Sequence, residues 1–153
     1  MKRQQPIYLV LANIRSAYNV GSIFRTADAA GVTKIYLCGI TSTPKNPKVL
    51  KTALGAEQSI PWEYVQQAGR LLSRLRKTAY IVALEQTSQS VDYRKIKLPA
   101  RKSLVLIVGN EVIGITKSLF KYANTIAEIP MYGKKESLNV AVATGIMLYE
   151  LKK

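Results

Sequence analysis

The chain has 153 residues, 48% of them hydrophobic, and carries 23 Lys and Arg against 9 Asp and Glu, a formal net charge of +14. This length suits one domain that buries most of the surface its unfolded form exposes. Cys38 is the only cysteine and histidine is absent. This composition excludes a disulfide within the chain, the common zinc sites, and the Ser-His and Cys-His nucleophile arrangements.

The positive charge favours binding to a polyanion, most simply a nucleic acid. Two alternatives are a basic surface that serves solubility and an anionic membrane surface; the latter is disfavoured because no basic amphipathic helix with bulky apolar anchors is present. No apolar run approaches the roughly 18 residues of a membrane span. The N-terminal MKRQQPIYLV has no small-residue cleavage site, so it predicts a strand rather than a signal peptide. We therefore expect a cytoplasmic protein that binds neither membranes nor metals.

In chain order, short apolar runs predict strands, and spacings of three and four residues predict helices. Strands that are apolar on both faces and alternate with helices imply an α/β fold, with a mostly parallel sheet and helices on both faces. No repeat or linker interrupts the chain, so we expect a single domain over 1–153. The expected elements are strands at 7–12, 34–40, 79–86, 103–111 and 125–130, and helices at 19–32, 49–55, 65–77, 117–123 and 139–153, with Gly31 at the first helix exit, a turn-rich loop at 41–47 and a basic connection at 91–102.

Three polar or glycine-rich segments directly follow apolar strands. They are NIRSAYNVG (13–21), GNEVIG (109–114) and MYGKKESLN (131–139). Ligands of parallel sheets bind beyond the carboxyl ends of the strands. We therefore expect these three segments to share one site.

The first segment leads into a helix that carries an arginine. Asn19 is a candidate cap for this helix, and Gly21 and Ser22 precede Arg25 on the same helical side. Because Gly21 has no side chain, we expect space beside Arg25. The segment is either a capped helix with a surface arginine or a guanidinium held near an anionic or developing oxyanionic group.

The second segment ends a buried strand at Gly109 and then supplies the carboxylate of Glu111. Its backbone is able to approach a ligand, although Glu111 is equally suited to capping the next turn. The segment matches neither G-x-G-x-x-G nor G-x-x-x-x-G-K-[ST]. Neither an ordinary nicotinamide fold nor a nucleoside triphosphatase is therefore supported.

The third segment precedes a helix that is apolar on nearly all sides, which predicts a helix buried nearly all round. Ser137 or Asn139 suits the N-terminus of this helix, but capping explains only one of them. The Gly-Lys-Lys-Glu-Ser loop also fits an anion or ligand site at a helix N-terminus.

Together, NVGSIFRTADAAGV, LVLIVGNEVIGI and IPMYGKKESLNVAVATGIMLYEL resemble the three motifs of the SpoU (TrmH-like) family of RNA ribose 2′-O-methyltransferases, within the SPOUT class. Their order and spacing agree with the family. The resemblance implies a SPOUT-type α/β fold with a C-terminal trefoil knot, no added RNA-binding domain and a homodimer. It also implies S-adenosylmethionine as cofactor and tRNA or rRNA as substrate.

The same resemblance assigns roles to residues at matching positions. The implied catalytic residues are Asn19, Arg25, Glu111, Ser137 and Asn139, and the implied cofactor contacts, mainly through backbone, are Gly109, Ile129 and Leu138. Tyr18 stands where many relatives have histidine, a difference that bears on RNA contact.

Methyl transfer to a ribose hydroxyl needs positioning and the removal of one proton. A guanidinium keeps its proton near neutral pH, so we hypothesise that Arg25 stabilises the developing alkoxide or holds the neighbouring phosphate. Two alternatives are a catalytically silent RNA-binding relative and a methyltransferase that acts on a base nitrogen. The sequence does not identify the RNA. Candidates for contact with it are Lys45, Lys48, Lys51, Arg94, Lys95, Arg101, Lys102, Lys134 and Lys135.

Overall fold

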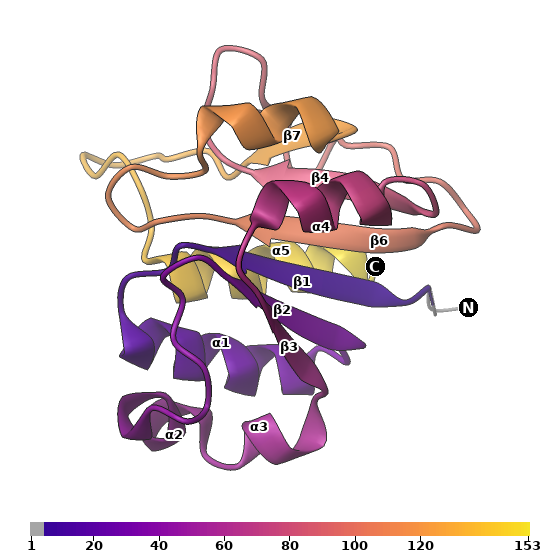
Figure 1. Cartoon of the computed structure of the whole chain (residues 1–153). Coiled ribbons are helices and arrows are strands. Elements are labelled where there is room, and N and C mark those ends of the chain that lie inside the picture. The colour runs from indigo at the N-terminus through magenta and orange to yellow at the C-terminus, as the bar shows by residue number, and fades with distance from the viewer. Residues whose placement is uncertain (1–4) are drawn as a thin grey trace.

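The computed structural model describes residues 5–153 and contains one seven-stranded sheet in the order β3-β2-β1-β6-β4-β7-β5 (Figure 1). Every neighbouring pair of these strands is parallel, which confirms the predicted α/β class with a sheet that is wholly rather than mostly parallel. The strands are β1 (Ile7–Ala12), β2 (Lys34–Cys38), β3 (Trp62–Val65), β4 (Ala79–Leu84), β5 (Val91–Asp92), β6 (Ser103–Val108) and β7 (Thr125–Glu128).

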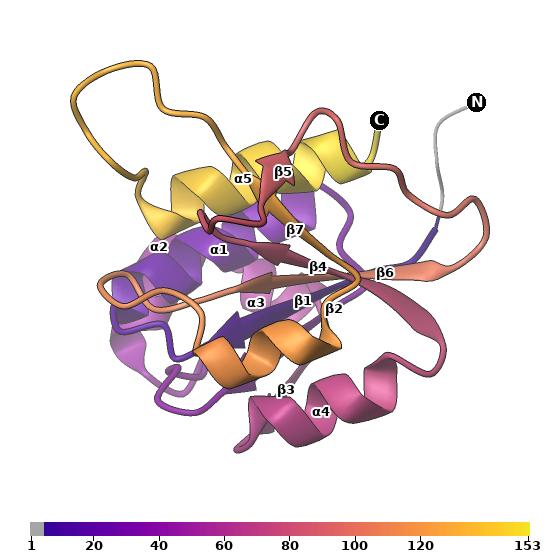
Figure 2. The same ribbon diagram turned by 90° about the horizontal axis from the view of Figure 1, so that it is seen from above.

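Helices cover both faces of the sheet, as Figure 2 shows. A core on one face includes Phe24 and Met147, and a second core on the other face includes Leu72 and Leu119. The central strands are apolar on both sides because each side meets one of these cores. On the first face lie α1 (Ala17–Ala29), α2 (Pro47–Ala53), α3 (Ala56–Ser59) and α5 (Val140–Leu151); on the second lie α4 (Ala68–Leu75) and the 3-10 helix η1 (Lys117–Tyr122).

The predicted helix at 65–77 is wrong at its N-terminal end. Val65 is the last residue of β3, which pairs with β2, and α4 begins only at Ala68. The signal for β3 is weak because it is an edge strand of four residues with an exposed middle. Within the predicted basic connection at 91–102, the structure likewise forms the two-residue strand β5, paired with β7.

The prediction that the last helix is buried nearly all round is also wrong for the chain by itself. Met147, Leu148 and Leu151 are fully buried, whereas Val142 and Tyr149 are 52% and 57% exposed. These two side chains lie seven positions apart, so they share one face of α5. No described element covers that face.

The last third of the chain builds strands on both sides of β4 and then returns to α1. β6 lies between β1 and β4, β7 lies beyond β4, and α5 packs against α1. Strand order does not define how such a path is threaded, so the trefoil knot stays a prediction. Within residues 5–153, no helix is both long and apolar enough to cross a membrane.

Candidate active site

The three predicted segments meet at one cavity of about 460 Å³, beyond the carboxyl ends of β4, β6 and β7. This volume lies in the range of small-molecule sites. The topological rule thus brings residues of the first, second and third segments to one cavity, and their roles stay predictions. Seven of the eight predicted site residues line the cavity: Asn19, Gly109, Glu111, Ile129, Ser137, Leu138 and Asn139.

Glu111 ties the loop after β6 to the start of α1. Its Oε1 accepts a hydrogen bond from the backbone N–H of Arg15 at 2.7 Å, and its Oε2 accepts one from the backbone N–H of Ser16 at 2.8 Å. The Asn19 side-chain amide donates to the same Oε2 at 3.0 Å. Glu111 therefore does not cap the turn that follows it in sequence; it binds the N-terminus of α1, whose dipole favours a negative charge.

These contacts determine the charge state of Glu111. Partial burial acts to raise the pKa of its carboxyl group, but the hydrogen bonds from Arg15, Asn19 and Ser16 outweigh it and hold the pKa below the ordinary value of 4.5. Glu111 is therefore ionised at neutral pH, with three donors already directed at it.

Asn19 and Asn139 join the N-termini of α1 and α5. The side-chain amide of Asn139 donates to Oδ1 of Asn19 at 3.1 Å. The Oδ1 of Asn139 accepts from the backbone N–H groups of Ala141 and Val142 at 2.8 and 3.2 Å, so Asn139 caps α5. Glu111, Asn19 and Asn139 thus form one continuous chain of hydrogen bonds.

The prediction that Asn19 caps the first helix is wrong. Ser16 is the N-cap residue of α1, and its Oγ accepts a hydrogen bond from the backbone N–H of Asn19 at 3.2 Å. Both residue types are strong caps, and the helix begins one turn earlier than the sequence pattern indicates. The Asn19 side chain is therefore free to bind Glu111 and Asn139 instead.

Two glycines bring the backbone of the β6 loop close to its neighbours. A Cβ atom at Gly109 would lie 2.6 Å from the backbone nitrogen of Ile115, and one at Gly114, whose φ is +73°, would meet the Glu85 carboxylate. That carboxylate accepts a hydrogen bond from Ile115 N–H at 2.8 Å. Only glycine fits these close approaches without displacing the loop.

Sequence reasoning missed the contribution of β4 to the cavity. Leu84, Glu85 and Gln86 line it at the carboxyl end of this strand. The signal was present, because Glu85 and Gln86 are polar residues directly after an apolar strand. The rule that found the other three segments applies to this one equally.

Gly21 has a different role from the predicted one. A Cβ atom there would collide with the Thr52 side chain and the Val49 carbonyl, so Gly21 lets α2 pack closely on α1. The space left by its absent side chain is filled by α2, which is distant in sequence. The open space beside Arg25 is bounded by other residues, and Gly21 does not line it.

Arg25 is the one predicted site residue that does not line the main cavity. It is exposed and lines a separate cavity of about 620 Å³ together with Lys51, Thr52 and Tyr149. Arg25 lies six positions after Asn19, which corresponds to about 9 Å along a helix and about 120° around it. The two side chains therefore leave α1 in different directions.

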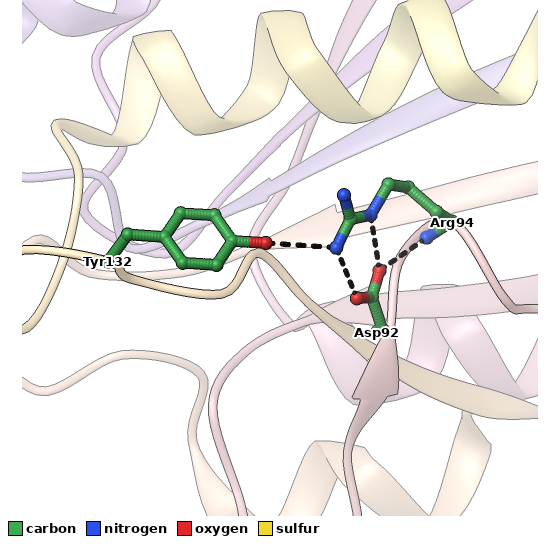
Figure 3. A network of polar contacts seen from close by, with 3 residues as sticks. All are labelled: Asp92, Arg94 and Tyr132. Carbon is green, nitrogen blue, oxygen red and sulfur yellow. Dashed lines mark hydrogen bonds and ion pairs between the residues drawn. The ribbon is translucent and has the colours of Figure 1, made fainter.

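The loop between β7 and α5 is held to the rest of the chain by a hydrogen bond at Tyr132. Figure 3 shows Arg94 between Asp92 and the Tyr132 hydroxyl. The Asp92 carboxylate accepts from Nε and a terminal nitrogen of Arg94 at 3.0 and 2.7 Å, and that terminal nitrogen also donates to Tyr132 at 3.0 Å. The side-chain and backbone hydrogen bonds from Arg94 lower the pKa of Asp92 to about 2. The pair therefore persists across the physiological pH range.

The nine basic residues predicted to contact RNA are all exposed. Arg94 is already engaged by Asp92 within the chain. The other eight make no ion pair with a residue of the described range 5–153. Their charges are therefore directed to solvent.

Two further observations concern the cysteine and the acidic side chains. Burial raises the pKa of the Cys38 thiol to about 12, so this cysteine is not a nucleophile near neutral pH. Among residues 5–153, no group of three or more His, Cys, Asp or Glu side chains is placed to hold a metal ion.

The fold and the cavity define an α/β protein with a cavity of small-molecule size beyond the carboxyl ends of a parallel sheet. Comparison with known proteins identifies the family. The chain matches the SpoU rRNA Methylase family over residues 6–149 and belongs to it. This confirms the family that the three motifs indicated.

Individual relatives cover almost the whole chain. The tRNA (guanosine(18)-2′-O)-methyltransferase of Aquifex aeolicus is 33% identical over 99% of this chain and 71% of its own length. The 23S rRNA (guanosine-2′-O-)-methyltransferase RlmB of Pseudomonas aeruginosa is 34% identical over 95% of this chain and 58% of its own length. The crystal structure of an AdoMet-bound rRNA methyltransferase from Sinorhizobium meliloti superposes with a TM-score of 0.87 at 36% identity, over 98% of this chain and 57% of that one. The chain thus spans less than two thirds of the length of the last two.

Proposed function

We propose that this chain is an RNA methyltransferase that transfers the methyl group of S-adenosylmethionine to a ribose 2′-hydroxyl of tRNA or rRNA. The observation that carries the proposal is the convergence of seven predicted site residues on one cavity. The names of the Aquifex and Pseudomonas relatives support the reaction and both RNA classes. The AdoMet-bound relative supports the cofactor. The cytoplasm, where such RNAs are made, is the proposed location.

The cavity fits the cofactor by size and by its lining. S-adenosylmethionine, when bound, supplies an electrophilic methyl group on a sulfonium. Gly109, Ile129 and Leu138 would hold it, since all three line the cavity, and Gly109 permits the close packing of the loop that forms this part of the wall. Both polar and apolar residues line the cavity, which suits a ligand that carries both a ring system and charged groups.

Among the polar residues of the cavity, some position other side chains and others contact the substrate. Glu111 has three donors directed at it, so it acts as a positioning residue that fixes Asn19, not as a free base. The amides of Asn19 and Asn139 are fixed relative to one another. Ser137 is exposed at the cavity, and its hydroxyl makes no hydrogen bond within the described residues, so we assign it to contact with the ribose.

We propose that two copies of the chain pair through the exposed face of α5. Val142 and Tyr149 form an apolar surface that no part of residues 5–153 covers, and burying such a surface is favourable. Tyr149 lines the same cavity as Arg25. Pairing through this face would place Arg25 at the interface, where it can contact RNA held by the other subunit. A Tyr149→Glu variant that remains a dimer by light scattering would contradict this arrangement.

The role proposed for Arg25 is to hold the phosphate next to the reacting ribose or to stabilise the developing alkoxide. An Arg25→Lys variant keeps the charge but loses the planar fork of donors. It should bind S-adenosylmethionine normally and methylate RNA more slowly. Methylation at the wild-type rate would exclude this role.

The reaction itself is tested by incubating the protein with isotopically labelled S-adenosylmethionine and RNA from cells that lack it. Nucleoside analysis should yield a 2′-O-methylnucleoside. A methylated base, or RNA binding without any transfer, would refute the proposal. The net charge of +14 also predicts that RNA affinity falls steeply with salt, so a flat response would argue against binding through phosphates.

A further inference from the structure

The turn after β6 presents two large aliphatic side chains to solvent. Val112 is 73% exposed and Ile113 is 76% exposed. Turns are normally built from Gly, Asn, Asp, Ser and Pro. Neither side chain belongs to the two cores of the described chain, so packing does not explain them.

This turn is held in one conformation. Asn110 and Gly114 exchange backbone hydrogen bonds of 3.1 and 2.9 Å across it. The Asn110 Oδ1 accepts from the N–H groups of Val112 and Ile113 at 2.8 and 3.1 Å, and its amide donates to the Asn13 carbonyl at 3.0 Å. The two aliphatic side chains are therefore carried on a preorganised backbone, which lowers the entropic cost of binding to them.

The turn borders the proposed active site. Val112 lines the main cavity, and its neighbour Glu111 is bound to the start of α1. A nucleotide that places its ribose in this cavity must bring its base to the rim. The sugar and phosphates of that nucleotide are polar, and the face of the base is the part that fits an aliphatic surface.

We propose that Val112 and Ile113 form an apolar platform for the face of an unstacked nucleobase, belonging to the nucleotide whose ribose is methylated. The inference rests on the proposed function, which it extends to the part of the substrate that this rim contacts. The many exposed lysines and arginines bind phosphates, and the platform binds the base. Because every base has such a face, the platform tolerates all four bases, and the choice among them is made by other residues.

The test uses the double variant Val112→Ser/Ile113→Ser and the matched control Ile40→Ser. Ile40 is 65% exposed just after β2 and does not line the cavity. The double variant should lose about tenfold in kcat/KM for RNA at saturating S-adenosylmethionine, with an unchanged melting temperature. The control should stay within about twofold of wild type.

A second measurement identifies the base as the group contacted. Once the methylated position is mapped, a substrate that is abasic at that position should reduce kcat/KM of the double variant by about tenfold less than it reduces that of the wild type. The contact between base and platform is already lost in the double variant, so only the contacts of the base with other residues remain to be removed. Independent, additive losses would overturn the platform. A changed oligomeric state in the double variant would also overturn it, by assigning the pair to a contact between copies.

Failure of the platform is distinguishable from failure of the proposed function. If the wild-type protein forms no 2′-O-methylnucleoside, the proposed function fails and the platform with it. If the wild type methylates RNA and the double variant matches it, the platform alone fails.

Discussion

Replacing Glu111 by glutamine tests how strongly the carboxylate holds the site together. Glutamine has the same shape, but it presents one oxygen and one NH₂ group where glutamate presents two oxygens. The carboxylate accepts hydrogen bonds from the backbone N–H groups of Arg15 and Ser16 and from the amide of Asn19. In the variant, the NH₂ group must face at least one of these donors.

The magnitude follows from the number and kind of bonds. A hydrogen bond to a charged group contributes about 1.5–3 kcal/mol, and the variant loses at least one and weakens the others. Glu111 is only partly buried, so water compensates for some of this loss. We expect the free energy of unfolding to fall by about 2 kcal/mol, or about 4–8 °C in melting temperature for a domain of this size.

The pH dependence gives the same prediction a distinct signature. The pKa of Glu111 is lower in the folded chain than the ordinary 4.5. Its carboxylate therefore contributes stability that is present above 4.5 and is lost as the pH falls through the folded value. The difference in the free energy of unfolding between wild type and Glu111→Gln should be constant from about pH 6 upward and should shrink below pH 4.5.

The assay is urea unfolding followed by circular dichroism at several pH values. The control is Glu63→Gln, since Glu63 forms a single ion pair at the surface, with Lys34 at 2.9 Å. That variant should change the free energy of unfolding by no more than about 0.5 kcal/mol. A Glu111→Gln variant as stable as the control, or a difference that grows as the pH falls, would refute the reasoning.

Three further substitutions probe the cavity and its loops. Gly109→Ala should abolish measurable S-adenosylmethionine binding in calorimetry, because the new Cβ would lie 2.6 Å from the Ile115 nitrogen and displace the loop. Normal binding would show that the loop accommodates the methyl group without losing the cofactor site. Asn139→Ala removes the cap of α5 and should lower the free energy of unfolding by about 1 kcal/mol, whereas Asn139→Asp should retain the cap and lose only transfer activity. Arg94→Met releases Tyr132 and should weaken cofactor affinity without changing the melting temperature, so unchanged affinity would show that the loop holds its position without this contact.

The location of the site was predictable because it follows from a simple topological rule. Apolar runs defined the central strands β1, β4 and β6 within two or three residues, since strands buried on both faces carry an uninterrupted hydrophobic signal. Polar segments after such strands then had to meet at one edge of the sheet. The cavity at that edge is the result.

The predictions that were wrong concern residues whose contacts lie far away in the sequence. Nothing near Gly21 shows that Thr52 packs on it, and nothing near Asn19 shows that its amide binds Glu111, 92 residues away. The predicted cap at Asn19 was chemically reasonable, but Ser16 was available one turn earlier. Arg25 was grouped with the other site residues by family resemblance, whereas the turn of α1 directs it to a different face.

The hydrogen bonds that Glu111 accepts from the start of α1, and the one that Asn139 donates to Asn19, span between 92 and 120 residues of sequence. A chain emerging from the ribosome therefore carries the first half of the site long before the second half exists. Asn19 therefore cannot meet Asn139 until the ribosome has added the 120 residues that lead from one to the other. During that interval the start of α1 is already made while its hydrogen-bonding partners are not, so the chain of contacts through Glu111, Asn19 and Asn139 closes only after both later segments have been synthesised.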